Sequence, residues 1–211
     1  KGLTREEIME LTGLPNNGNT TKLLLELEES GFIRRYTPFE RDKRESLYQL
    51  IDLYTLFYLK FIRNGQLPDD NNWINAMEGP MYRAWSGYAF EMVCLCHIAQ
   101  IKQGLSIAGM VTQAASWRGK HKDKTAQVDL LIDRRDHVIN LCEIKFSQQK
   151  FTITKEYAAQ LERKMEVFKS ETATQKAVWL TLLTTFGLTE NEYAHRLVHK
   201  ALTMDVLFGT P

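Results

Sequence analysis

Cysteine, net charge and long apolar runs are all scarce in this sequence, and each shortage excludes a class of protein. The 211 residues include only three cysteines, with no CxxC pair, so we expect neither a disulfide scaffold nor a zinc framework, and a reducing, cytoplasmic location fits. The net charge is +1, so binding of nucleic acid would have to depend on local basic patches. No apolar run is long enough to span a bilayer and no signal peptide is visible, so no membrane partner is expected.

What remains is the composition of an ordinary globular protein. Hydrophobic residues make up 44% of the chain and charged residues 25%, which is enough apolar material for a core without disulfide or metal support. The length allows one large domain or two small ones. The sequence begins with "KGLTREE", without Met, and enters a helix pattern almost at once, so we expect a piece of a longer protein.

The first 50 residues have the pattern of two short helices followed by a β-hairpin. Thr4 and Glu7 are placed to form a capping box at the start of the first helix, and Gly13 ends it. A second helix is expected over residues 19–30. The segment "GFIRRYTPFERDKRESLYQL" then has the pattern of strand, charged loop and strand.

This order is the layout of a winged helix-turn-helix, and "LLLELEESGFIRRY" resembles that family. The resemblance implies that the second helix is the recognition helix and that residues 37–45 form the wing. The recognition helix ends in acidic residues that would repel phosphate, whereas the hairpin carries basic residues suited to DNA. DNA binding and a protein-docking role both stay open. The basic residues are Arg34, Arg35, Arg41, Lys43 and Arg44.

A change in composition divides the chain into two parts. The segment 51–63, "IDLYTLFYLKFIR", is aromatic and amphipathic, and we expect a connecting helix that completes a first domain at 1–64. Residues 65–80 are polar and contain proline and glycine, as in a linker. Residues 81–211 predict the order α, β, β, β, α, β, α, which is an α/β domain with a mixed sheet. The fold class is therefore α/β for this domain and α+β overall.

Within the second domain, the hydrophobic pattern predicts where each element lies. The expected elements are a long helix over 81–103, a strand within 105–117, a basic loop "RGKHKDK", a hairpin over 127–147, a helix over 154–170, a buried strand "AVWLTLLTTFG" and a closing helix "TENEYAHRLVHKALTMDVLF".

The hairpin segment "QVDLLIDRRDHVINLCEIKFS" carries charges within both of its strands. Asp129 interrupts the first strand, and Glu143 and Lys145 interrupt the second. Because side chains alternate between the two faces of a strand, one face of each strand stays apolar and the other gathers these charges. A turn near Asp136 would place Asp129 directly across from Glu143, about 5 Å away between Cβ atoms.

Two carboxylates at such a distance repel each other unless a cation lies between them. Carboxylate oxygens are ligands that Mg²⁺ prefers, and Mg²⁺ keeps several waters. One of those waters can attack a phosphate while the metal neutralises the developing charge. The neighbouring lysine can orient the water or stabilise the transition state, so the pattern indicates phosphodiester hydrolysis.

The pattern D-x₁₃-E-x-K on a hairpin resembles the PD-(D/E)xK nuclease superfamily. The resemblance implies a restriction-endonuclease-like domain with a mixed central sheet flanked by helices. It implies that Asp129 and Glu143 bind Mg²⁺, with Mn²⁺ as a substitute, and that Lys145 is catalytic beside them. Glu91 in "SGYAFEMV" matches the acid on the helix before the sheet and would complete the metal site and the catalytic set. Val128 stands where the family often has proline.

The whole chain resembles the C-terminal half of a family of prokaryotic AAA+ type ATPases, through "GYAFE", "QVDLLIDR" and "INLCEIKFS" after a winged helix. The resemblance implies an ATPase domain upstream, which alone would bind ATP, because no GxxxxGK[ST] occurs here. Two functions stay open. One is Mg²⁺-dependent cleavage of nucleic acid, and the other is an inactive nuclease fold that binds DNA or a protein and regulates the ATPase. The oligomeric state is left open.

Several other residues are candidates for binding roles. The basic loop before Asp129 is expected to contact nucleic acid, with an exposed flexible loop as the alternative. Asp133 is expected either to support the site or to be simply a polar residue near the hairpin turn. Lys155 and Gln160 could reach the site from the following helix. The basic loop residues are Arg118, Lys120, Lys122 and Lys124.

Two apparent metal motifs are better explained without a metal. On a helix, Cys94, Cys96 and His97 would point in different directions, so buried cysteines are expected. His195 and His199 are four residues apart, but no third ligand is evident and a solvated helix face is expected.

Overall fold

The computed structural model describes residues 2–42, 45–63, 77 and 79–209. The chain divides into two compact units, Lys1–Ser86 and Gly87–Pro211, and helix α5 (Pro80–Cys96) contributes residues to both. The linker predicted at 65–80 lies for the most part outside the described residues. Within those residues, no helix combines the length and the apolar character needed to cross a membrane.

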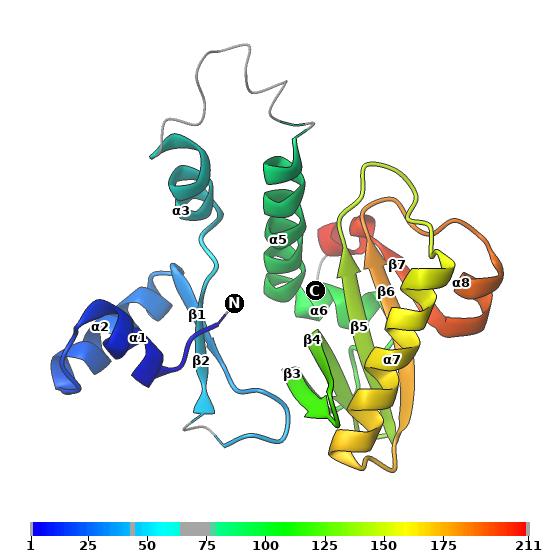
Figure 1. Cartoon of the computed structure of the whole chain (residues 1–211), viewed down its shortest axis with the longest axis horizontal. Helices are drawn as coiled ribbons and strands as arrows, with labels where there is room; N and C mark the ends of the chain where they lie inside the picture. The colour runs from blue at the N-terminus through cyan, green and yellow to red at the C-terminus, as the bar shows by residue number, and fades with distance from the viewer. Residues whose placement is uncertain (1, 43–44, 64–76, 78, 210–211) are drawn as a thin grey trace. The chain divides into compact units, whose positions relative to one another are not determined.

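The first unit has two short helices followed by an antiparallel β-hairpin, in the predicted order (Figure 1). The Thr4 hydroxyl accepts a hydrogen bond from the backbone N–H of Glu7, and Gly13 has a φ of 71°, so the predicted caps of the first helix are confirmed. The elements are α1 (Arg5–Thr12), α2 (Gly18–Glu29), β1 (Ile33–Tyr36), β2 (Leu47–Leu50), α3 (Leu53–Phe57) and the π-helix η2 (Tyr58–Ile62).

The connecting segment predicted at 51–63 is helical and packs through aromatic side chains. Asp52 caps α3, and η2 continues it with a wider turn. Phe61 is fully buried, and its ring centroid lies 5.7 Å from that of Trp85 on α5. Phe57 lies 5.6 Å from the same ring. Edge-to-face aromatic pairs of this kind stabilise a small core beyond the area that they bury.

The second unit is built on a five-stranded sheet with the order β3-β4-β5-β6-β7. The first three strands pair antiparallel and the last three pair parallel, so the predicted mixed sheet is confirmed. The strands are β3 (Thr112–His121), β4 (Lys124–Arg134), β5 (Val138–Lys145), β6 (Ala177–Thr184) and β7 (Val198–Thr203). The helices are α5, α6 (Ile98–Gly104), α7 (Lys155–Thr172), α8 (Glu192–Leu197) and the 3₁₀-helix η3 (Met204–Phe208).

Helices cover both faces of this sheet. Figure 1 shows α7 lying along the sheet, and the buried Phe168 of α7 packs 5.0 Å from the ring of Trp117 on β3. On α5, burial and the neighbouring Cys142 thiol raise the pKa of Cys94. Cys142 precedes Glu143, so the two side chains point to opposite faces of β5. The end of α5 therefore covers the face opposite Glu143.

The predicted closing helix is wrong in its middle part. Glu192–Leu197 form an α-helix and Met204–Phe208 a 3₁₀-helix, but Val198–Thr203 between them form β7, which pairs parallel with β6. The pairing supplies backbone partners for this segment and buries Leu202, which outweighs the helical period of the sequence.

Two further predicted elements differ in extent. The helix expected over 81–103 breaks at His97, whose φ of −115° and ψ of 37° are not helical. The basic segment expected as a loop is instead the paired end of the β3–β4 hairpin, with His121 opposite Lys124. Pairing with a neighbouring strand gives this charged segment a regular structure that its own sequence does not indicate.

Candidate active site

The most buried charged group of the second unit surrounds Glu143 on β5, which is 5% exposed. Lys145 Nζ lies 3.1 Å from Glu143 Oε1, and the Tyr157 hydroxyl donates a hydrogen bond of 2.8 Å to the same oxygen. Lys164 Nζ lies 2.5 Å from Glu143 Oε2. Both carboxylate oxygens are therefore engaged by groups from β5 and α7.

The charges around Glu143 keep it ionised. Burial by itself would raise the pKa of Glu143, but the ammonium groups of Lys164 and Lys145, with hydrogen bonds from Lys164 and Tyr157, hold it below its ordinary value. Burial and the charges of Glu143 and Asp129 raise the pKa of Tyr157. The site thus holds a carboxylate, two ammonium groups and a neutral phenol, and such perturbed groups are typical of functional sites.

The lowered pKa of Glu143 predicts a pH dependence of stability. A Glu with a lower pKa in the folded chain stabilises the fold above its unfolded value of about 4.3, and this contribution is lost as pH falls through the folded value. We expect urea unfolding to show a smaller loss of stability between about pH 6 and pH 3 for Glu143→Gln than for the native chain. The control is Glu162→Gln, which alters an exposed carboxylate paired with Arg196. Equal acid sensitivity in all three proteins would contradict the prediction.

The register predicted for the hairpin of β4 and β5 is confirmed. Leu131 pairs with Leu141, as expected from a turn near Asp136, and the last pair joins Leu130 to Cys142. The two carboxylates of the predicted site come one residue beyond this last pair. The pairing stops one residue short of Asp129 and Glu143, so the direct opposition of these two carboxylates stays a prediction.

A β-bulge in β4 lies where this pairing ends. Between the pair Ala115–Leu131 and the pair Trp117–Val128, β3 advances by two residues and β4 by three. One extra residue is therefore accommodated at Asp129 and its neighbour, and regular alternation of side chains breaks there. Bulges are over-represented next to active sites, where they redirect a side chain.

Asp129 lies in the same neighbourhood as Glu143. Its side chain is half-buried, and its Oδ1 accepts a hydrogen bond of 2.8 Å from Gln127 Nε2. The charge of Asp129 is one cause of the raised pKa of Tyr157, and Tyr157 donates to Glu143. The structure therefore brings Asp129, Glu143 and Lys145 around one phenol.

Glu91 belongs to the helix on the other face of the sheet. It is half-buried on α5, three residues before Cys94, whose neighbour on β5 is Cys142. Its predicted role as the third acid stays a prediction. In the part of the chain that the structure describes, no group of three or more His, Cys, Asp or Glu side chains is arranged to hold a metal ion.

Sequence reasoning missed two residues of this site, Tyr157 and Lys164. It proposed Lys155 and Gln160 on the same helix, and both are exposed. A signal was present, because Tyr157 and Lys164 are seven residues apart and share a helix face with the buried Leu161. A lysine on an otherwise apolar stripe, beside a strand with a buried acid, indicates an ion pair between the two.

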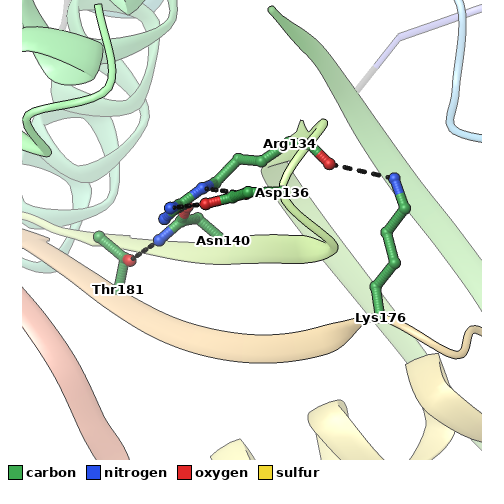
Figure 2. Close-up of polar contacts among 5 residues, drawn as sticks. All are labelled: Arg134, Asp136, Asn140, Lys176 and Thr181. Atoms are coloured by element: carbon green, nitrogen blue, oxygen red, sulfur yellow. Dashed lines mark hydrogen bonds and ion pairs between the residues drawn. The ribbon is translucent and has the colours of Figure 1, made fainter. Parts of the chain in front are cut away.

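A second polar network holds the turn of the hairpin (Figure 2). The Arg134 guanidinium donates to both carboxylate oxygens of Asp136 and donates a hydrogen bond of 3.3 Å to Asn140. Asn140 in turn donates to Thr181 over 3.0 Å, and Lys176 donates to the Arg134 carbonyl over 3.2 Å. The turn is thus fixed to β6 independently of the Glu143 group.

The remaining candidates lie apart from Glu143. Asp133 pairs with Lys176 over 2.5 Å, so it belongs to the turn network rather than to the site. His195 lies on α8 and His199 on β7, so they do not share the expected helix face. The free cysteines are Cys94 and Cys142, which are buried, and Cys96, which is exposed.

The basic residues of the second unit lie on the β3–β4 hairpin. Arg118 is paired with Gln127, two residues before Asp129, and Lys122 occupies the turn with a φ of 53°. Lys124 pairs with Glu166 of α7 over 3.4 Å. The remaining member of the set is Lys120. These residues precede Asp129 along the same hairpin, and their contact with nucleic acid stays a prediction.

The basic residues of the first unit are partly occupied by neighbours. Arg34 donates to Gln49 over 2.7 and 2.9 Å. Ion pairs join Arg35 to Glu28 over 3.7 Å and Arg41 to Glu45 over 3.2 Å. Lys43 and Arg44 lie outside the described residues. The predicted role of this hairpin in DNA binding is untested.

No protein-family model, curated protein or solved structure matches the chain.

The donors at Glu143 suit a hard divalent cation on one condition. Asp129 and Glu143 offer carboxylate oxygens, which Mg²⁺ prefers, and the lowered pKa of Glu143 keeps it charged at neutral pH. However, Lys145 and Lys164 engage both oxygens of Glu143. A cation that binds Glu143 would therefore share an oxygen with an ammonium group that repels it, or take the place of that group.

Proposed function

We propose that the second unit is a nuclease-like domain that hydrolyses phosphodiester bonds of nucleic acid. The supporting observation is the buried, ionised Glu143 between Lys145 and Lys164, with Asp129 at a bulge on the adjoining strand. Burying such charges is costly, and apolar residues of similar size would often stabilise a fold equally well. The cluster is therefore better explained by chemistry than by packing.

Each residue of the cluster has a role in this proposal. Asp129 and Glu143 would hold Mg²⁺, or Mn²⁺ in its place, whereas Glu91 lies on the helix over the other face of the sheet and is assigned no role at this site. Such a cation supplies a nucleophilic water when bound and neutralises charge on the phosphate. Lys145, whose side chain is 36% exposed, orients the attacking water and stabilises the charge that develops on the phosphate. Tyr157 holds the Glu143 carboxylate in place through its hydrogen bond.

The basic hairpin of β3 and β4 supports nucleic acid as the substrate. Arg118 and its basic neighbours lie along the strands that lead to Asp129, so a phosphate backbone bound there would extend toward the site. Lysine and arginine contacts to phosphate give affinity without sequence specificity, and they weaken as salt increases.

We also propose that the chain is the C-terminal part of an AAA+ type ATPase. The motifs "GYAFE", "QVDLLIDR" and "INLCEIKFS" support this assignment, and the two helices and hairpin of the first unit agree with a winged helix. ATP would bind only upstream of this chain. The first unit would contact DNA or dock onto a protein.

A second function is favoured by a specific observation. Protein groups already satisfy both oxygens of Glu143, as expected of a nuclease fold that has lost its metal. Such a domain would bind nucleic acid or a protein without cleavage and would regulate the ATPase.

Replacement of Asp129 separates the two functions. We expect Asp129→Ala to bind labelled DNA or RNA as the native chain does, but to cleave it at least about 100-fold more slowly, because a metal ligand is lost. Binding and cleavage are measured on the same single- and double-stranded DNA and RNA, with Mg²⁺ or Mn²⁺. The control is Asp123→Ala, which removes an exposed acid from the β3–β4 turn.

Three outcomes decide between the proposals. Cleavage by the native chain that Asp129→Ala loses supports the nuclease. Binding without cleavage, equal in both proteins, supports the regulatory module. Neither binding nor cleavage of any of these nucleic acids by the folded protein rejects both as nucleic-acid functions.

A further inference from the structure

We propose that Lys164 competes with the divalent cation for Glu143, and that this lysine therefore determines how strongly the site binds the cation. The inference rests on the proposed function, because it concerns the cation that the nuclease chemistry requires. It goes beyond that function by assigning a role to a residue of α7 that the D-x₁₃-E-x-K pattern does not contain.

The two oxygens of Glu143 have different surroundings. Oε1 is shared by Lys145, at 3.1 Å, and the Tyr157 hydroxyl, at 2.8 Å. Oε2 is approached by Lys164 at 2.5 Å, which makes Lys164 the nearer of the two ammonium groups. A Mg²⁺ ligand oxygen lies about 2.1 Å from the metal. A cation and an ammonium group that share one buried oxygen repel each other, so binding of the cation at Oε2 is weakened as long as Lys164 stays there.

Lys145 is the more exposed of the two lysines, at 36% against 21% for Lys164, but it has a second contact that holds its ammonium group in place. Lys145 comes from the same strand as Glu143, and its Nζ also lies 5.4 Å from the centre of the Tyr157 ring, which gives it a cation–π contact. Lys164 comes from α7, and its side chain is 21% exposed. A long, flexible lysine side chain can keep its stem packed while its ammonium group turns to water.

Competition at Oε2 links the binding of the cation to the binding of a phosphate group. Whatever Lys164 contributes to its bond with Glu143 is subtracted from the binding of the cation. A phosphate group that accepts the released ammonium group would reduce this penalty. The site is therefore built to bind the cation weakly alone and more tightly together with a phosphodiester.

Titration of Mn²⁺ into the whole chain tests the proposal without any cleavage assay. Isothermal calorimetry at about pH 8 compares the native chain with Lys164→Met and Lys164→Gln, of which glutamine keeps a hydrogen-bond donor. We expect both variants to bind Mn²⁺ about tenfold more tightly, within the usual range of coupling between sites. The control is Lys169→Met, which removes an exposed lysine from the same helix and should bind as the native chain does. Far-ultraviolet circular dichroism establishes which variants are folded.

The outcomes distinguish this inference from the proposed function. Tighter binding in a folded Lys164 variant, lost when Glu143→Gln is added, supports the competition. If the native chain binds Mn²⁺ and the Lys164 variants bind it equally or more weakly, the competition is wrong while the nuclease proposal stands. If neither the native chain nor any folded variant binds Mn²⁺, both proposals fail.

Discussion

Replacement of Glu143 by glutamine is expected to slow nucleic-acid cleavage by at least about 1,000-fold, if the second unit is a nuclease. Glutamine has nearly the same shape and can still accept a hydrogen bond from Tyr157. It lacks the negative charge that a metal ligand requires, and one of its two oxygens becomes an NH₂ group that faces a lysine. The change therefore removes chemistry while it preserves most of the packing.

The measurement is the initial rate of cleavage of a labelled oligonucleotide in Mg²⁺ or Mn²⁺. Lys145→Met should give a loss of similar size, because the ammonium group 3.1 Å from Glu143 is removed. Glu162→Gln, on the outer side of α7, should cleave at the native rate. A folded Glu143→Gln protein with near-native cleavage would show that this carboxylate is not part of the active site.

Replacement of Lys164 by methionine is expected to lower the free energy of unfolding by about 2 kcal/mol. Removing one partner from a buried ion pair costs about 3–5 kcal/mol, because the remaining charge is left without compensation. Two observations reduce the expected value. Lys145 still contacts Glu143, and the Lys164 side chain is 21% exposed, so water screens part of the interaction.

A double-mutant cycle in urea separates this ion pair from the loss of packing. The cycle combines Lys164→Met with Glu143→Gln, and the two changes together should cost clearly less than the sum of their separate costs. Lys169→Met is the matched control and should leave stability within about 0.5 kcal/mol of the native value. Strict additivity in the cycle would mean that the two side chains do not stabilise each other.

The part of the site that lies within the hairpin could be predicted, because its geometry depends on local rules. Alternation of side chains and a turn near Asp136 were sufficient to pair Leu131 with Leu141. The contacts from α7 could not be obtained in this way. They join residues 14 and 21 positions apart, Tyr157 and Lys164 with Glu143, and depend on how the helix crosses the sheet.

One wrong prediction and one unpredicted feature of the fold have a related cause. The segment 198–203 has a pattern that suits a helix, and it is a strand because β6 offers an edge to pair with. The bulge at Asp129 depends on the pairing of β4 with β3, and no local feature of β4 reveals an extra residue. In both cases a partner strand overrides a preference inferred from the sequence alone.

The bulge in β4 has a consequence for changes of chain length. Val128 pairs with Trp117, which packs on α7, and Leu131 pairs with Leu141, which shares a face with Glu143. Residues three apart would ordinarily face opposite sides of the sheet, and only the extra residue lets both face α7. Deletion of one residue here would move the side chains of the first half of β4 to the opposite face of the sheet. Insertions and deletions at this position are therefore restricted by geometry, whichever amino acids occupy it.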